Sequence, residues 1–470
     1  MDEKFFEIEK HRKRLAVIDS RVGNLYYSDL LEMSSKLNIN NSNEKKLVFL
    51  ICKNNFETMA GYISFLRSNA CILLLSQNIS ENELKVMTDL YQPNYIYGPS
   101  KIKNIIPNSK TKILLETYRL LELKLNKKFI INKNLALLLT TSGSVGDPQV
   151  VRQSYENIIS NSNAICTSLK IKKNDKAITT LPMNYTYGLS IINSHLLKGA
   201  SLVLTDNSII TREFWDLFKK SNVTTFGGVP YTFEILKKVK FENMILPSLK
   251  YITQAGGKLD QNLIDHFYKI CKINKFKFII MYGQTEASPR MSYLKWKELK
   301  KYKKSIGKPI PGGKFYLINE SGKKIIKNYT SGELAYSGAN VCLGYANNRS
   351  DLSKGDENKK FLNTGDIAYR NNQGFYYIVG RKKRFIKLYG HRINLDAVEK
   401  IIENEGYSCA CTGNDKNINI FLNNKNKTIM KKIKSTINMK IPLIKKCYKI
   451  IFINKIPRSE NGKILYSQLK

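Results

Sequence analysis

The sequence lacks long apolar segments and is poor in the residues that build metal centres. None of its apolar runs approaches the roughly 18 residues that a membrane-spanning helix needs. The first residues are charged and lack the apolar core of a secretory signal. With only 4 histidines, and with 8 cysteines of which only Cys409 and Cys411 lie close together, a zinc site is disfavoured. We therefore expect a cytoplasmic protein without a transmembrane segment.

Acidic residues are also scarce, with 38 Asp and Glu against 77 Lys and Arg, which gives a net charge of +39. One interpretation is a polyanionic partner, such as nucleic acid or an anionic membrane surface. The other is a biased composition, because the lysines are dispersed along the whole chain. No run of aromatic and arginine residues typical of RNA-binding domains occurs. We therefore expect no nucleic-acid partner, and polyanion binding stays an alternative.

The chain is too long for one domain, and its apolar residues are grouped in short runs. Residues 46–52 predict a buried strand, residues 55–67 a helix and residues 71–75 the next strand. Strands of this length separated by helices favour parallel sheets covered on both faces. We predict an α/β fold with a large N-terminal domain of doubly wound sheets. Further strands are predicted at residues 95–97, 135–139, 176–181, 201–204, 223–226, 250–253 and 276–281.

The pattern changes after residue 305, where glycine turns and shorter strands predict a β-rich subdomain. Residues 374–380 resemble a hairpin that leads into a basic run at residues 381–384. We place a domain boundary there, between an N-terminal domain of residues 1–380 and a small C-terminal α+β domain of residues 381–470. Local signals predict a capping box at Ser80 and Glu83, a helix N-cap at Asn394 and a surface excursion at residues 101–134.

A loop of small residues follows the predicted strand at 135–139. It contains Thr141, Ser142, Gly143, Ser144 and Gly146. Glycines let the backbone come close to a ligand, and hydroxyl and free N–H groups then point at an anion. A strand, such a loop and a helix together form an arrangement that holds phosphate. We predict phosphate binding here, and an ordinary surface turn is the alternative interpretation.

Four further motifs follow this loop in the chain. They are Tyr-Gly-Gln-Thr-Glu at 282–286, Thr-Gly-Asp at 364–366, Gly-Arg at 380–381 and Pro-Arg-Ser-Glu-Asn-Gly-Lys at 457–463. The ordered set resembles the adenylate-forming (AMP-binding) superfamily of acyl-CoA and aryl-CoA synthetases, peptide-synthetase adenylation domains and luciferase. This resemblance extends from about residue 25 to the last residue. It implies an ATP-dependent acid–thiol ligase that adenylates a fatty or aryl carboxylate and transfers the acyl group to coenzyme A.

The resemblance also assigns roles in the adenylation step, for which ATP and Mg²⁺ are the expected cofactors. Tyr282 would stack on adenine, Gly283 would contact the nucleotide, Thr285 would touch the α-phosphate and Glu286 would bind Mg²⁺, a hard cation that prefers carboxylate oxygen. Lys463 would reach the α-phosphate and the incoming carboxylate together. Its flexible stem suits a group that arrives and leaves with a mobile C-terminal domain. Further nucleotide contacts are expected from Gly256, Gly257, Asp366 and Arg381, with Asp366 accepting hydrogen bonds from the ribose hydroxyls.

Three residues would serve the second, thioester-forming step. Lys383 lies where the family carries its hinge, and Lys387 and Gly390 match the segment that swings in for this step. The alternative interpretation is a solvated basic run. The thiol would belong to coenzyme A, or to the phosphopantetheine of an acyl carrier protein. We favour coenzyme A because no added docking segment is visible in the sequence.

The acyl pocket is expected at residues 182–188, which resemble a pocket-lining segment of the family. Tyr185, Tyr187 and Gly188 would line it, together with Gly228 from a later strand end. Amino-acid-activating relatives place an aspartate in this segment, and none occurs between Leu181 and Leu189. An ammonium group without a counter-charge is costly to bury. We therefore expect a carboxylic acid without an α-amino group.

One departure from the family pattern concerns the phosphate loop. Gln149 stands where the family carries a lysine, which puts a strong grip on the γ-phosphate in doubt. Arg152 is near enough in the chain to be a candidate substitute. An inactive nucleotide binder therefore remains an alternative, as does a ligase that loads a carrier protein.

Overall fold

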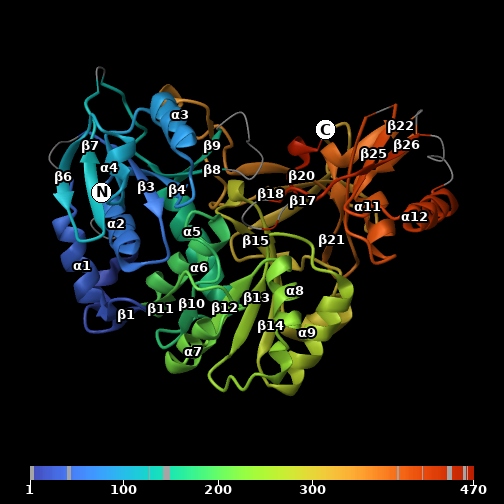
Figure 1. Cartoon of the computed structure of the whole chain (residues 1–470), viewed down its shortest axis with the longest axis horizontal. Helices are drawn as coiled ribbons and strands as arrows, with labels where there is room; N and C mark the ends of the chain where they lie inside the picture. The colour runs from blue at the N-terminus through green and yellow to red at the C-terminus, as the bar shows by residue number, and fades with distance from the viewer. Residues whose placement is uncertain are drawn as a thin grey trace. The chain divides into compact units, whose positions relative to one another are not determined.

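The computed structural model describes residues 5–39, 44–125, 128–140, 149–388, 391–414, 416–441, 447–458, 462 and 464–469. The chain divides into two compact units (Figure 1). The first comprises residues 1–314 and 336–362, and the second residues 315–335 and 363–470. The expected boundary of a mobile domain at residues 380–381 stays a prediction.

An eight-stranded sheet forms the N-terminal part of the first unit. Its central strands are parallel, and antiparallel strands flank them on both sides. In spatial order the strands are β19 (Gly344–Ala346), β9 (Val150–Ser154), β8 (Leu135–Thr140), β4 (Cys71–Ser76), β3 (Leu47–Cys52), β5 (Tyr95–Pro99), β7 (Tyr118–Glu122) and β6 (Lys110–Leu114).

A nine-stranded sheet forms the rest of the first unit. Its strands from β14 to β1 are parallel, and the outer strands are antiparallel. In spatial order they are β16 (Lys308–Pro309), β15 (Arg290–Leu294), β14 (Lys277–Gly283), β13 (Tyr251–Gln254), β12 (Thr225–Gly228), β10 (Lys176–Ile178), β11 (Ser201–Leu204), β1 (Leu15–Asp19) and β2 (Gly23–Tyr26).

Helices fill the space between the two sheets and cover their outer faces (Figure 1). The inner helices are α1 (Tyr27–Lys36), α2 (Phe56–Arg67), α5 (Tyr155–Leu169) and α6 (Thr186–Leu197). The remaining helices are α3 (Glu81–Tyr91), α4 (Ile102–Ile105), α7 (Arg212–Lys220), α8 (Pro230–Lys238), α9 (Gln261–Ile273) and α10 (Trp296–Tyr302). Strand β3 is apolar throughout because both of its faces are buried. Val48 and Leu50 point into the core between the sheets, and Leu47 and Phe49 into the core with α3.

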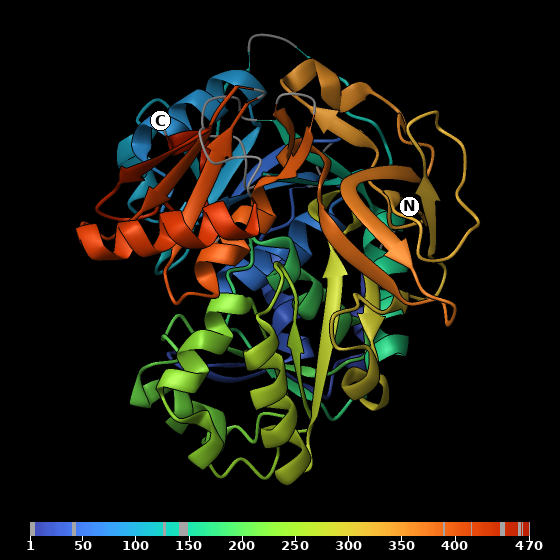
Figure 2. The ribbon, with the colours of Figure 1, turned by 90° about the vertical axis from the view of Figure 1, so that its right-hand side faces the viewer.

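The second unit holds two larger sheets and a short hairpin. One sheet has the order β17 (Lys314–Ile318), β18 (Gly332–Ser337), β20 (Phe361–Arg370) and β21 (Tyr376–Arg381). The other contains β24 (Cys409–Gly413), β25 (Ile418–Leu422) and β26 (Tyr448–Phe452), and the hairpin joins β22 (Phe385–Leu388) to β23 (His391–Asn394). Helices α11 (Leu395–Glu403) and α12 (Lys427–Lys440) pack on one face of the three-stranded sheet (Figure 2).

Most expectations about local structure are confirmed, and one is wrong in part. The capping box at Ser80 and the N-cap at Asn394 both form. Residues 101–134 are not merely a surface excursion, because β6 and β7 extend the eight-stranded sheet there. Leu120 and Leu121 on β7 are buried on its opposite faces. Among the helices in the described ranges, none is both long enough and apolar enough to cross a membrane.

Candidate active site

Several of the predicted site residues that the structure describes in the first unit lie at one edge of the nine-stranded sheet. Strands β10, β12, β13 and β14 run parallel, so their carboxyl ends lie at the same edge. At or just beyond these ends lie Gly228, Gly256, Gly257, Tyr282, Gly283 and Tyr185. The Gln254 side chain stabilises the turn after β13, because its Nε2 donates a hydrogen bond of 2.8 Å to the backbone oxygen of Gly257.

Thr285 and Glu286 lie in a 3₁₀ turn, η3 (Thr285–Ala287), which directly follows β14. The Thr285 hydroxyl lies 3.1 Å from that of Thr186, the first residue of α6. The backbone oxygen of Thr285 accepts a hydrogen bond of 2.8 Å from Gln153 Nε2 on β9. The predicted α-phosphate residue is therefore held against both α6 and β9.

The carboxylate of Glu286 is oriented by a tyrosine from the eight-stranded sheet. Its Oε1 accepts a hydrogen bond of 2.7 Å from the hydroxyl of Tyr345 on β19. Burial, and next the Glu286 carboxylate, raise the pKa of the Tyr345 hydroxyl, so the phenol stays protonated and donates. A carboxylate offers about four lone-pair positions, so this bond leaves room for a hard cation. The residues present therefore fit a Mg²⁺ ion.

Sequence reasoning missed Gln153, Thr186 and Tyr345. Gln153 and Tyr345 lie on β9 and β19, which pair antiparallel although they are far apart in the chain. No local pattern links them to Glu286. Thr186 alone carried a signal, because it lies within the pocket segment that the motifs had indicated.

Arg152, the candidate substitute for the missing lysine, is held by residues from other parts of the chain, and the loop itself lies outside the described residues. Its side chain is 0% exposed. Its nitrogen atoms donate to the carboxylate of Glu357 and to the backbone oxygens of Leu343, Tyr345, Lys354 and Gly355. This guanidinium therefore fixes β19 and the segment after it, and each of its three nitrogen atoms already donates to a protein oxygen.

Tyr185 and Tyr187, which are predicted to line the acyl pocket, contact each other. Their rings lie 6.4 Å apart in an edge-to-face arrangement. Gly256 has a φ of +83°, and a Cβ there would lie 2.5 Å from the Tyr185 hydroxyl, so only glycine lets the turn approach this ring. The Tyr187 hydroxyl lies 2.8 Å from that of Thr253 on β13. Burial raises the pKa of both tyrosines, which are therefore neutral groups.

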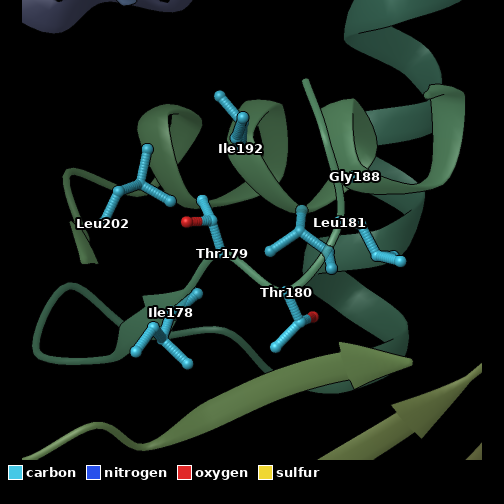
Figure 3. Close-up of a pocket in the computed structure, with 9 residues that line it drawn as sticks. Ile178, Thr179, Thr180, Leu181, Gly188, Ile192 and Leu202 are labelled. Atoms are coloured by element: carbon cyan, nitrogen blue, oxygen red, sulfur yellow. The ribbon is translucent and has the colours of Figure 1, made fainter. Parts of the chain in front are cut away.

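The other predicted pocket glycines serve close packing. A Cβ on Gly188 would lie 2.5 Å from the backbone oxygen of Pro182, and one on Gly228 would lie 2.7 Å from the Thr232 side chain. A small cavity of about 10 Å³ lies beneath α6 (Figure 3). It is lined by Ala177, Ile178, Thr179, Thr180, Leu181, Gly188, Ile191, Ile192 and Leu202. It holds at most one water molecule and cannot itself receive the acid.

In the second unit, the two predicted ribose residues lie side by side. Asp366 on β20 and Arg381 on β21 are register partners in an antiparallel pair. Arg381 Nε lies 3.4 Å from Asp366 Oδ1. The Asp366 residue is buried, whereas the Arg381 side chain is 69% exposed. The cation can therefore move without disturbing the strand that holds the carboxylate.

The predicted hinge residue Lys383 lies between two residues whose side chains bond different parts of the second unit. Just before it, Lys382 Nζ bonds Glu333 on β18 over 2.7 Å. Just after it, Arg384 bonds Asp396 and Glu399 on α11 over 2.7 and 2.6 Å. Lys383 itself is exposed, in the short 3₁₀ turn η5 (Lys382–Arg384).

For several predicted site residues the structure describes no side chain. Lys387 lies on β22, and nothing is described of its side chain. The other residues fall outside the described ranges, so their roles stay predictions. They are Thr141, Ser142, Gly143, Ser144, Gly146, Gly390 and Lys463. Gln149, which is described, bonds Asn347 Oδ1 through its Nε2 over 3.0 Å.

Comparison with known proteins identifies the family. The family model described as "AMP-binding enzyme" matches residues 7–346, more than half of the chain. The chain belongs to this family of AMP-binding enzymes. Its fold matches that of O-succinylbenzoate coenzyme A synthetase from Bacillus subtilis in complex with ATP and magnesium, with a TM-score of 0.79 and 19% identity over 100% of this chain and 99% of that one.

Two curated relatives of this AMP-binding enzyme are also similar in sequence. Oxalate–CoA ligase of Saccharomyces cerevisiae is 25% identical over 72% of this chain. The mitochondrial medium-chain acyl-CoA ligase ACSF2 of Homo sapiens is 26% identical over 74% of this chain. The matches span 63% and 59% of the length of these two relatives.

Proposed function

We propose that this protein is an AMP-forming acid–thiol ligase. It would join a carboxylic acid to the α-phosphate of ATP and then pass the acyl group to coenzyme A. The observation that carries this proposal is the 3.1 Å contact between the hydroxyls of Thr186 and Thr285. It joins the predicted acid-pocket segment, residues 182–188, to the residue expected at the α-phosphate, where the two substrates would have to meet.

Different residues would bind and orient the metal ion, the ribose and the α-phosphate. Glu286 would hold Mg²⁺, which supplies positive charge for the phosphate oxygens when bound. Tyr345 would fix the direction of this carboxylate. Asp366, supported by Arg381, would accept hydrogen bonds from the ribose hydroxyls. Lys463 would bring a positive charge to the α-phosphate during adenylation.

The acid would carry no α-amino group. Tyr185 and Tyr187 offer neutral hydroxyls to the pocket and no carboxylate. The Arg290 guanidinium lies 4.8 Å from the centre of the Tyr187 ring, so this region already holds a positive charge. A second cation would be repelled there. The names of the relatives, an oxalate ligase and a medium-chain acyl ligase, agree with acids that lack an amino group.

Coenzyme A is the proposed acceptor, and a carrier protein is the rival. Residues 381–470 contain 21 Lys and Arg against 6 Asp and Glu, a net charge of +15. Such a charge would steer either anionic acceptor. Both relatives named above are coenzyme A ligases, which supports coenzyme A. The change of hydrogen-bonding partners around Lys383 supports a hinge there, with the mobile domain beginning near residue 381.

The decisive experiment measures pyrophosphate release with ATP, Mg²⁺ and a panel of carboxylic acids. We expect release with at least one acid, and its loss in Glu286→Gln. No release with any acid would favour an inactive nucleotide binder or a polyanion-binding protein. The active acid is then offered with coenzyme A or with a pantetheinylated carrier protein. A preference for the carrier above about 100-fold in kcat/KM, worth about 2.7 kcal/mol, would replace the acceptor and keep the adenylation step.

A further inference from the structure

A buried arginine lies beside the predicted acid pocket. Arg290 begins β15, the strand that returns antiparallel to β14 after the Tyr282–Ser288 segment. Only 2% of the residue is exposed. Its side chain runs between α6 and β14, where it touches Ser190 and Met281. The motifs did not single it out.

The protein gives this guanidinium weak partners. Its Nε donates a hydrogen bond of 3.1 Å to the hydroxyl of Ser190, and its Nη1 lies 2.9 Å from the thioether sulfur of Met281. A guanidinium has five N–H donors, and a thioether is a weak acceptor. Within the described ranges no carboxylate lies within ion-pair distance of it. Apart from the face of the Tyr187 ring, no described group balances this buried charge, and burying a charge without a counter-charge is costly.

Two other buried arginines of the same unit have more oxygen acceptors than Arg290 has. Arg152 donates to four backbone oxygens and to the carboxylate of Glu357. Arg349 donates to the backbone oxygen of Tyr91 and to the amide oxygen of Asn94, and its Nε has no partner among the described residues. Arg290 alone among these three has a single oxygen acceptor in the described part of the chain.

The position of Arg290 points toward the acid. Its guanidinium faces the Tyr187 ring at 4.8 Å, and Ser190 lies one helical turn after Tyr187 on α6. Tyr187 is one of the two tyrosines that are predicted to line the acyl pocket. A planar guanidinium binds a carboxylate through two parallel hydrogen bonds. The flexible Met281 side chain is the contact most easily displaced by such a group.

We propose that Arg290 receives a second carboxylate of the substrate, so that the acid activated is a dicarboxylic acid. One carboxylate would meet ATP near Thr285, and the other would pair with Arg290 beside Tyr187. This inference rests on the proposed ligase function and on the same pocket. It narrows the substrate class from any acid without an amino group to one with negative charge at both ends.

The test compares acids in matched pairs, each a monocarboxylate and the dicarboxylate of equal chain length. Butanoate with succinate and hexanoate with adipate are suitable pairs. Pyrophosphate release gives kcat/KM for each acid. We expect at least one dicarboxylate to exceed its partner by 10-fold or more. In Arg290→Gln, the ratio of dicarboxylate to monocarboxylate kcat/KM should fall by about 100-fold.

Two controls separate charge recognition from a structural role. Arg349→Gln removes a buried arginine elsewhere in the same unit, and it should lower the melting temperature without changing the substrate ratio. Arg290→Lys keeps the charge without the planar fork, and it should retain part of the preference. If Arg290→Gln fails to fold, the ratio in the wild type and in Arg290→Lys still decides the question.

Binding is also measured without turnover, as the rise in melting temperature that each acid causes. A rise with dicarboxylates that disappears in Arg290→Gln supports the proposal. A wild-type preference for monocarboxylates, or equal rises for both members of every pair, overturns it. If no acid releases pyrophosphate, the proposed function fails, and the melting temperatures still decide the role of Arg290.

Discussion

Replacing Tyr345 by phenylalanine tests how Glu286 is positioned for its metal. The substitution removes one hydroxyl and leaves the ring on β19. The hydroxyl donates to Glu286 Oε1 over 2.7 Å, and its raised pKa keeps it protonated across the pH range of an assay. Because the other links to Glu286 run through the backbone, including the 2.8 Å bond from the Cys342 N–H, the turn η3 should keep its place. The substitution should therefore change only the orientation of the Glu286 carboxylate.

The expected size of the effect follows from the nature of the bond and its exposure. A hydrogen bond to a charged group contributes about 1.5–3 kcal/mol. Tyr345 is 38% exposed, so water can partly replace the lost donor and the lower end applies. About 1.5 kcal/mol corresponds to a roughly 10-fold weaker Mg²⁺ affinity, at the low end for partners of metal ligands.

The assay titrates Mg²⁺ at saturating ATP and acid and follows pyrophosphate release. Tyr345→Phe should raise the half-saturating Mg²⁺ concentration about 10-fold and leave the melting temperature nearly unchanged. Tyr231→Phe, at an exposed tyrosine on α8, is the matched control and should change neither quantity. An unchanged or lower Mg²⁺ requirement in Tyr345→Phe would refute the positioning role.

Three further outcomes are expected. Lys463→Ala should lower acyl-adenylate formation about 10²-fold or more and spare thioester formation from supplied acyl-adenylate, and equal loss in both half-reactions would contradict its assignment. Lys383→Pro should spare pyrophosphate release and abolish acyl transfer, because proline fixes φ at the hinge, and wild-type transfer would move the hinge elsewhere. Burial lowers the pKa of His195 from 6.5 to about 4 in the folded protein, so between these pH values only the unfolded chain binds a proton at this residue. The free energy of unfolding should therefore fall by up to about 3 kcal/mol as the pH drops from 6.5 to 4. Urea midpoints at pH 7 and 4.5 check this, and His195→Gln should show a smaller fall.

Much of the fold could be predicted because its central strands are buried on both faces. Strands such as β3 and β4 then read as continuous apolar runs, which turn residues and helix caps delimit. Strands β6 and β7 were harder to predict because β6 is the edge strand of its sheet and β7 lies next to it, and many of their side chains are exposed or only partly buried. The lysine and asparagine residues around these strands indicate an exposed surface, and they give no sign that the strands pair with a sheet.

The candidate site could be predicted only where one segment of chain carries both the scaffold and the chemistry. Tyr282, Thr285 and Glu286 satisfy this condition, because they follow one strand and share a motif. The partners that hold them come from the other sheet, through the pairing of β9 with β19. Such contacts depend on tertiary structure, so the sequence pattern around Tyr345 or Gln153 gives no sign of them.

The neighbours Arg152 and Gln153 show why nearness in the chain does not predict nearness to a ligand. Side chains on a strand alternate between its faces, so adjacent residues of β9 point in opposite directions. Gln153 reaches the backbone of Thr285, whereas Arg152 turns to the segment after β19. The charged residue, Arg152, therefore holds the scaffold, and the neutral amide of Gln153 supports the site. These contacts therefore give no support to Arg152 as the cation for the γ-phosphate.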